Sequence, residues 1–138
     1  MENDIEVSNL SSLDLAFIGD AIFTFFIRKT ILKNFCNKYK INDLSKKCSY
    51  FVSAKYQSYI IDYLIEKNLL TEEEINIYKL GRNHHSKSRA KNTSIVNYRK
   101  ATGFESLIGY LYYHDKENRL IDLSNIIEDI IVDEINND

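Results

Sequence analysis

The stretch that decides the fold lies near the N-terminus and reads LDLAFIGDAIFTFFIR, residues 13–28. It contains no proline, and its apolar residues recur at the three- and four-residue spacing of a helix. The face that this spacing predicts consists of Leu13, Ala16, Phe17, Asp20, Phe23, Thr24 and Ile27. Asp20 thus shares a face with apolar side chains, where loss of water disfavours its charged form unless a hydrogen bond, a cation or a metal compensates. Gly19 lacks a side chain, so another helix or a ligand has room to approach beside Asp20.

Length and composition favour one all-α domain spanning residues 1–138. A chain of this length is large enough for one core and short for two. It contains no proline and only four glycines, so long helices form easily and tight β-turns are scarce. Residues 1–11 are polar and are expected to form a loose lead-in, whose acidic start does not resemble a signal peptide. No apolar run reaches the length of a membrane span, so a cytoplasmic protein without membrane contact is expected.

Periodicity and capping residues predict six helices. The first is expected from Leu13 to Asn34, with Ser11 or Ser12 as its N-cap. The second is short, capped by Asn42 or Asp43. Two of the remaining four are expected over residues 54–67, with Ser53 as the cap, and 72–80. The other two are a region that Thr93 or Ser94 caps and that reaches His114, and residues 117–135. Residues expected on the inner face of the helix over 54–67 are Tyr56, Tyr59, Ile60, Tyr63 and Leu64. Thr71 and Glu74 form a capping box, and Gly81 is expected to end that helix in the left-handed conformation.

The net charge of −2 conceals a segregation of charge along the chain. Residues 81–100 carry six basic side chains and no acidic one, whereas the remainder carries 12 basic and 20 acidic ones. Phosphates are bound by a local cluster of Lys and Arg, whatever the charge of the whole chain. Residues 82–92 lack apolar periodicity and are expected to form a basic surface loop. The side chains expected to contact nucleic-acid phosphates are Arg82, Lys87, Arg89, Lys91 and Arg99, with ion pairing to acids elsewhere as the alternative for Arg82 and Arg99.

A second acid lies on a mostly apolar helical stripe in the stretch TGFESLIGYL, residues 102–111. Glu105 there shares a face with Ala101, Ile108, Gly109 and Tyr112. If this helix crosses the first one near Gly19, the carboxylates of Asp20 and Glu105 converge. Two carboxylates in one partly dehydrated cleft repel each other, and a divalent cation removes that conflict. Mg²⁺ is commonly held by one or two carboxylates with waters and substrate phosphates, and it stabilises charge on a phosphate under in-line attack.

The two acidic stretches resemble motifs of ribonuclease III catalytic domains. The run LAFIGDA, residues 15–21, resembles the signature helix, and FESLIG, residues 104–109, resembles the second acidic motif. The segments between them are similar to the narrower Mini-ribonuclease III family, which has the catalytic domain without an appended double-stranded-RNA-binding domain. The segments that carry this likeness are Gly81-Arg82-Asn83, Lys91-Asn92-Thr93, Tyr98-Arg99 and Thr102-Gly103-Phe104-Glu105. The resemblance spans nearly the whole chain, from Leu13 to Leu120.

The resemblance implies that Asp20 and Glu105 are the catalytic acids and that they bind Mg²⁺. It implies an all-helical homodimer whose signature helices pack across the two-fold axis, each protomer cutting one strand of double-stranded RNA to leave 5′-phosphate and 3′-hydroxyl ends. It further implies a role in maturation of the 23S ribosomal RNA precursor, with a ribosomal protein as a possible partner in presenting the RNA. The phenylalanines of residues 13–28 are accordingly expected in the core and the dimer interface.

Four positions depart from the acidic pattern of these families. Full-length ribonuclease III enzymes have acids where this chain has Ala16 and Thr102. Mini-ribonuclease III members often have acids where this chain has Thr24 and Ser94. Fewer direct ligands leave more water around the metal, so the departures bear on metal affinity and cleavage rate.

Two other functions compete with this interpretation. One is a helical RNA-binding or ribosome-associated module that keeps the fold without the chemistry, because fold does not imply function. The other is a metal phosphohydrolase of the HD type built on His114-Asp115, for which His84, His85 and Asp122 are the only further ligand candidates. His114 lies at an expected helix C-terminus, where a positively charged histidine interacts favourably with the helix dipole, so it can serve a structural role instead.

Overall fold

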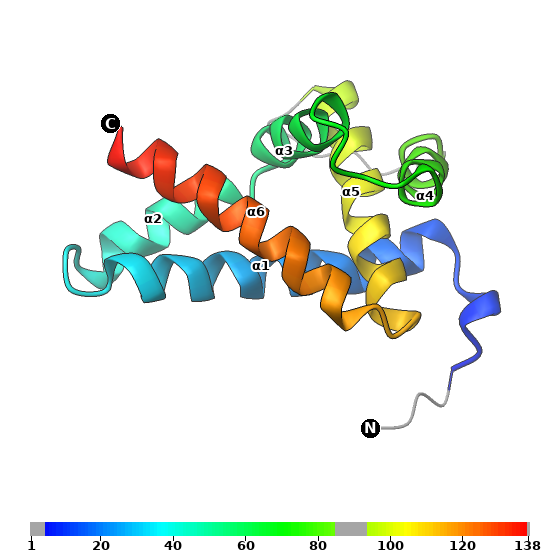
Figure 1. Cartoon of the computed structure of the whole chain (residues 1–138), viewed down its shortest axis with the longest axis horizontal. Coiled ribbons are helices and arrows are strands. Elements are labelled where there is room, and N and C mark those ends of the chain that lie inside the picture. The colour runs from blue at the N-terminus through cyan, green and yellow to red at the C-terminus, as the bar shows by residue number, and fades with distance from the viewer. Residues whose placement is uncertain (1–4, 85–93, 138) are drawn as a thin grey trace.

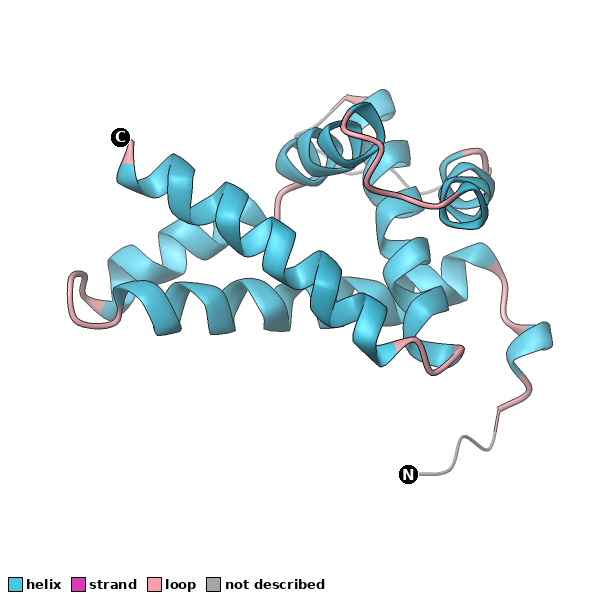
Figure 2. Ribbon diagram, in the orientation of Figure 1, coloured by secondary structure: helices cyan, strands magenta, loops and turns pink. Residues whose placement is uncertain are grey.

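The computed structural model describes residues 5–84 and 94–137. The described ranges contain helices and loops and no strand, which confirms the all-α prediction (Figure 2). In chain order the elements are the 3-10 turn η1 (Val7–Asn9) and the helices α1 (Ser12–Phe35), α2 (Ile41–Phe51), α3 (Ala54–Glu66), α4 (Glu72–Arg82), α5 (Ile95–Tyr113) and α6 (Glu117–Asn136). None of these helices is both long enough and apolar enough to cross a bilayer. Within the predicted lead-in, residues 1–11, the 3-10 turn η1 is ordered.

Helix α5 is the centre of the packing (Figure 1). It crosses α1 near the start of that helix and packs against α3, α4 and α6 as well. Helix α2 lies beside the other end of α1, and α6 crosses α1 obliquely. At the crossing, the fully buried rings of Phe23 and Phe104 meet edge to face with their centroids 5.2 Å apart. Aromatic pairs favour this geometry because the positive edge of one ring faces the negative face of the other. The contact ties the two acidic stretches of the sequence into one core.

The capping predictions account for most helix starts. Ser11 and Asp14 form a capping box at α1, and Thr71 and Glu74 form the expected one at α4. Ser53 and Ser94 accept hydrogen bonds from the third backbone N–H of α3 and α5. Each side chain satisfies an N–H that has no partner within its helix. Glu74 also receives two hydrogen bonds from Arg119 at 2.7 and 2.9 Å, which link α4 to α6.

Two helix ends differ from the prediction. Helix α2 begins at Ile41 after Lys40, which makes no side-chain cap bond, so Asn42 and Asp43 lie inside the first turn. Helix α4 continues through Gly81 to Arg82, and Gly81 does not have a positive φ. Gly81 is instead needed for space, because a Cβ there would lie 2.5 Å from Ser106 Oγ and 2.9 Å from the Cα of Gly103 in α5. The helix crossing, and not a left-handed turn, explains this glycine.

The predicted inner face of α1 is wrong in part. Its buried side is formed by Leu15, Ala16, Gly19, Phe23, Ile27, Ile31 and Phe35. Phe17 is 84% exposed, Asp20 is exposed and Thr24 is half-buried. Because α1 carries apolar residues around most of its circumference, spacing alone does not select the side that packs on α5. The same limit applies to α3, where Tyr59, predicted to face inward, is 50% exposed.

Candidate active site

Two glycines bring α1 and α5 into backbone contact. A Cβ on Gly19 would collide with the backbone carbonyl of Glu105, and a Cβ on Gly109 would collide with that of Leu15. Only glycine permits two helices to approach this closely, because every other residue places a side-chain carbon in the gap. The crossing near Gly19 that the sequence suggested is therefore present.

The crossing places the carboxyl groups of Asp20 and Glu105 side by side. Asp20 follows Gly19 on the exposed side of α1, and Glu105 is half-buried on α5, where the two side chains interact through a hydrogen bond. Burial, followed by the hydrogen bond and the negative charge of Asp20, raises the pKa of Glu105 to about 8. At neutral pH Glu105 thus holds a proton, and a cation placed between the two groups would favour its loss.

A third side chain, which sequence reasoning missed, contacts Glu105. Gln57 on α3 is 2% exposed, and its amide nitrogen lies 3.3 Å from Glu105 Oε2 and 3.0 Å from the carbonyl oxygen of Val52. The hydrogen bond to Glu105 opposes part of the rise in the pKa of that carboxyl. The sequence did contain a pattern that could have identified Gln57. It is a polar residue at helical spacing from Ile60, Ile61 and Leu64, as Asp20 is among the apolar residues of its own helix.

The oxygen atoms of this pair suit a hard divalent cation. Within residues 5–84 and 94–137, no three His, Cys, Asp or Glu side chains are grouped to hold a metal. Two carboxylates are nevertheless the ligand set that Mg²⁺ commonly takes, completed by water and substrate phosphate, whereas structural zinc takes four protein ligands. The amide oxygen of Gln57, the residue whose nitrogen contacts Glu105, is buried and has no hydrogen-bond partner among the described residues.

The four departures from the acidic pattern have visible local consequences. Ala16 is buried, and Thr102 donates its hydroxyl to the carbonyl of Tyr98 at 3.0 Å. Thr24 is half-buried and lines a hollow between α1 and α2, and Ser94 caps α5. No acid takes their place beside the pair among the described residues, so a metal at Asp20 and Glu105 would retain more water.

Only two of the five basic residues predicted to contact phosphates lie in the described ranges. Arg82 is half-buried over the ring of Tyr78, 5.5 Å from its centroid, and Arg99 is exposed on α5. Neither guanidinium is paired with a carboxylate of the described chain, whereas Lys100 is bound to Asp62 at 2.9 Å. Lys87, Arg89 and Lys91 lie outside the described residues, as does His85.

Among the described residues, the rival site at His114 lacks the ligands that an HD-type phosphohydrolase requires. The imidazole stacks on Tyr110 with a centroid separation of 3.9 Å, and its Nδ1 lies 2.9 Å from the Tyr110 carbonyl. Asp115 has φ 55° and forms the turn between α5 and α6. With no cluster of metal-ligating side chains around them in the described chain, the two residues end a helix.

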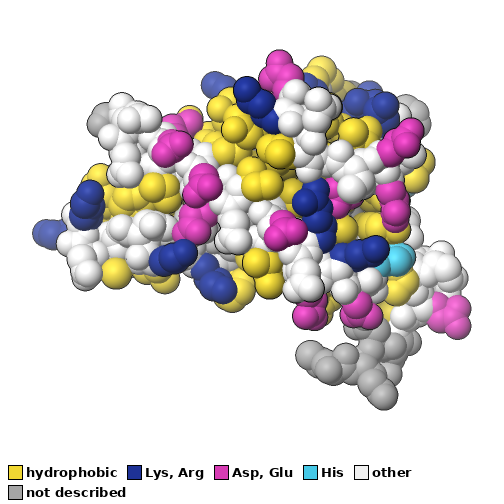
Figure 3. Space-filling model, in the orientation of Figure 1, with side chains coloured by type: hydrophobic (Ala, Val, Ile, Leu, Met, Phe, Trp, Pro, Cys, Tyr) yellow, Lys and Arg dark blue, Asp and Glu magenta, His cyan; other side chains and the backbone are white. Residues whose placement is uncertain are grey.

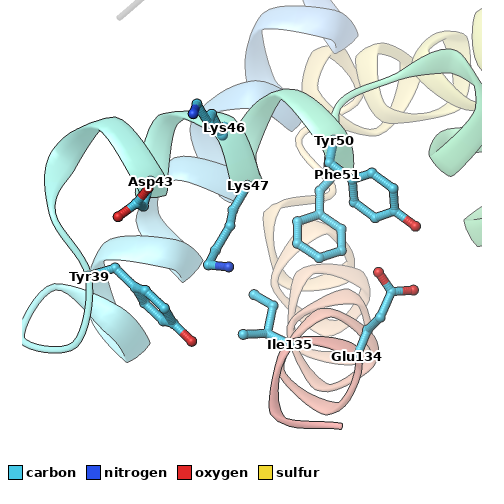
Figure 4. Close-up of a pocket in the computed structure, with 8 residues that line it drawn as sticks. All are labelled: Tyr39, Asp43, Lys46, Lys47, Tyr50, Phe51, Glu134 and Ile135. Atoms are coloured by element: carbon cyan, nitrogen blue, oxygen red, sulfur yellow. The ribbon is translucent and has the colours of Figure 1, made fainter. Parts of the chain in front are cut away.

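A separate hollow of about 770 Å³ lies between α2 and the end of α6 (Figure 4). Its lining combines aromatic rings with charges of both signs, from Asp43, Lys46, Lys47 and Glu134. Lys47 lies over the ring of Tyr39, 4.4 Å from its centroid. None of the predicted site residues lines this hollow, so the candidate active site is the carboxylate pair.

Comparison with known proteins identifies the class of protein to which this helical fold belongs. Residues 13–116 match the family model described as "Ribonuclease III domain". The chain is 42% identical over 125 residues to "Mini-ribonuclease 3" of Clostridium tetani, which covers 88% of this chain and 79% of that protein. The protein of the same name from Staphylococcus aureus is 39% identical over 131 residues, with 94% and 96% covered. The chain therefore belongs to the Mini-ribonuclease III family and is an endoribonuclease of the ribonuclease III type.

A solved structure supports the same fold. The crystal structure of a protein from Fusobacterium nucleatum superposes with a TM-score of 0.74 at 37% identity, covering 88% of this chain and 93% of that one. Ribonuclease III enzymes act on RNA, generally depend on a divalent metal and typically dimerise through this domain.

Proposed function

We propose that this protein cleaves double-stranded RNA in a Mg²⁺-dependent reaction, with Asp20 and Glu105 as the catalytic and metal-binding acids. The observation that carries the proposal is the meeting of these two carboxyls at the Gly19–Gly109 crossing, from positions 85 residues apart in the chain. When bound, Mg²⁺ supplies positive charge that activates water and stabilises the phosphate under attack. To hold the metal, Glu105 would have to lose the proton that its raised pKa favours, so metal affinity is expected to fall as pH decreases.

The RNA is held through its phosphates. Arg82 and Arg99 have no carboxylate partner in the described chain, and Arg82 Nε donates only to the neutral Asn83 Oδ1 at 3.2 Å, so both positive charges are available to a polyanion. Lys87, Arg89 and Lys91 belong to the same basic segment of sequence. Duplex RNA hides its bases and is recognised by shape, phosphates and 2′-hydroxyls, so these contacts select the duplex and not a sequence. On the face that carries α6, acidic and basic side chains are interspersed, which does not favour a polyanion there (Figure 3).

A homodimer supplies one carboxylate pair for each strand. Apolar side chains form an exposed stripe along α1, with Phe17 84%, Phe25 58% and Leu32 50% exposed. Exposed apolar patches of this kind mark interaction surfaces. A second copy packed on this stripe lies next to Asp20, because Asp20 is on the exposed side of the same helix. Each protomer then cuts one strand and leaves 5′-phosphate and 3′-hydroxyl ends.

The proposed biological substrate is the precursor of 23S ribosomal RNA, with a ribosomal protein as a partner that presents it. The proposal rests on membership of the Mini-ribonuclease III family. Incubation of the protein with precursor RNA, with and without ribosomal proteins, tests it by mapping the 5′ ends produced.

The chemistry is tested with three substrates: long duplex RNA, single-stranded RNA and duplex DNA, each with Mg²⁺ and with chelator. We expect cleavage of duplex RNA alone, and only with Mg²⁺. Asp20→Asn is expected to abolish cleavage while the circular-dichroism spectrum and sedimentation stay those of the wild type. Cleavage by Asp20→Asn at the wild-type rate would remove Asp20 from the mechanism. Binding of duplex RNA without cleavage by the wild type would support the non-catalytic RNA-binding module instead.

A further inference from the structure

Gln57 is held between the end of α2 and the carboxylate pair. Its side chain is almost completely buried, and it reaches Glu105 from a helix other than those that carry the two acids. The carbonyl of Val52, the C-cap residue of α2, lies 3.0 Å from the same amide nitrogen. Gln57 thus connects the acid to a second fixed point of the backbone.

The chemistry of the two neighbours determines the orientation of the amide. A backbone carbonyl is only an acceptor, so the group of Gln57 that faces Val52 must be the NH₂ group. The same nitrogen carries a second hydrogen, which is directed to Glu105 Oε2 at 3.3 Å. Because both hydrogens are engaged, the Glu105 carboxyl is held in one rotational position by a group that cannot itself rotate without losing the Val52 bond.

Packing alone does not explain a glutamine at this position. Its amide oxygen is buried and has no hydrogen-bond partner among the described residues. A methionine or leucine would fill a similar volume without this unpaired oxygen. Unpaired buried polar atoms are rare in folded proteins and indicate a strained or functional site or a further ligand.

We propose that Gln57 is a positioning residue for the active site: the hydrogen bond from its amide nitrogen fixes the Glu105 carboxyl toward Asp20, in the orientation that binds a divalent cation. This inference rests on the proposed function, because it assigns the metal to the same pair. Partners of this kind hold metal ligands in the orientation for binding, and their loss typically weakens metal affinity by about 10- to 100-fold.

The test measures Mn²⁺ binding to the full-length protein without RNA, by electron paramagnetic resonance. Gln57→Met removes the amide at nearly constant volume and is expected to weaken Mn²⁺ binding by about 10- to 100-fold. Ser106→Ala is the matched control, because Ser106 is also fully buried, directly follows Glu105, and has its hydroxyl 2.8 Å from two backbone carbonyls. We expect the control to lower the unfolding temperature and leave Mn²⁺ affinity unchanged.

If Gln57→Met does not fold, a second variant tests the role of Gln57. Gln57→Glu keeps the shape and adds a third carboxylate, so we expect a lower unfolding temperature without metal and a larger rise on adding Mn²⁺ than in the wild type. Wild-type Mn²⁺ affinity in Gln57→Met, or a wild-type rise in Gln57→Glu, overturns the role of Gln57 alone. If Asp20→Asn binds Mn²⁺ as tightly as the wild type, the metal does not bind at the pair, and the proposed function fails together with this inference.

Discussion

Replacing Gly19 with alanine tests the link between helix packing and the active site. The added Cβ would collide with the backbone carbonyl of Glu105 and would lie 3.0 Å from the backbone nitrogen of Gly109. A flexible side chain could move aside, but these atoms belong to the backbone of α5, so the helices must separate.

Two contributions of opposite sign determine the change in stability. Alanine is favoured over glycine inside a helix by about 1 kcal/mol. Overpacking costs about 1–3 kcal/mol, and the upper end applies here because backbone must shift. We expect a net loss of about 2 kcal/mol in the free energy of unfolding, which lowers the melting temperature by roughly 4–10 °C in a chain of this size. A displacement of about 1 Å between the two acids is expected to reduce the cleavage rate about 100-fold.

The assay pairs thermal unfolding with duplex-RNA cleavage at a temperature where each variant is folded. Gly81→Ala is the matched control, since its Cβ would overlap Ser106 and Gly103 at the crossing of α4 and α5, away from Gly19. It is expected to lower stability comparably while the folded protein keeps most of its activity. Wild-type activity in a folded Gly19→Ala variant would refute the claim that the close crossing aligns the carboxylates.

Three further predictions concern charge, RNA and assembly. The pKa of Glu105 is raised to about 8, so its protonated form stabilises the metal-free protein fully below the ordinary carboxyl pKa, and this contribution is lost as pH rises toward 8. Chemical denaturation from about pH 5 to 9 should show the free energy of unfolding decline. Glu105→Gln should remove this pH dependence. Lys87→Ala combined with Arg89→Ala should reduce the salt slope of RNA binding by about 1 to 2, measured by fluorescence anisotropy, and an unchanged slope would place the RNA elsewhere. Phe17→Glu, at a side chain 84% exposed, should give a folded monomer in sedimentation at micromolar concentration, whereas a wild-type protein that is itself monomeric there would contradict the proposed interface.

Much of the candidate site can be predicted from the sequence, for a physical reason. Asp20 and Glu105 each occupy an otherwise apolar helical stripe beside a small residue, and an acid in such a place needs compensation. The inward orientation predicted for Asp20 was nevertheless wrong, because α1 is apolar on several sides and its partner helix determines which side is buried. Gln57 shows the same kind of signal but was overlooked, since a neutral amide attracts less attention than a charge.

The sequence alone determined the helices, most of their N-caps and the two acidic residues of the candidate site, because periodicity and capping depend on neighbours within four positions. The tertiary structure determined how those helices meet: the contact at Gly19 and Gly109, the space that Gly81 leaves for α5, and the attachment of Glu105 to Gln57. These features depend on residues up to 94 positions apart. Their approach is determined by the burial of whole helix faces, which no local sequence pattern specifies.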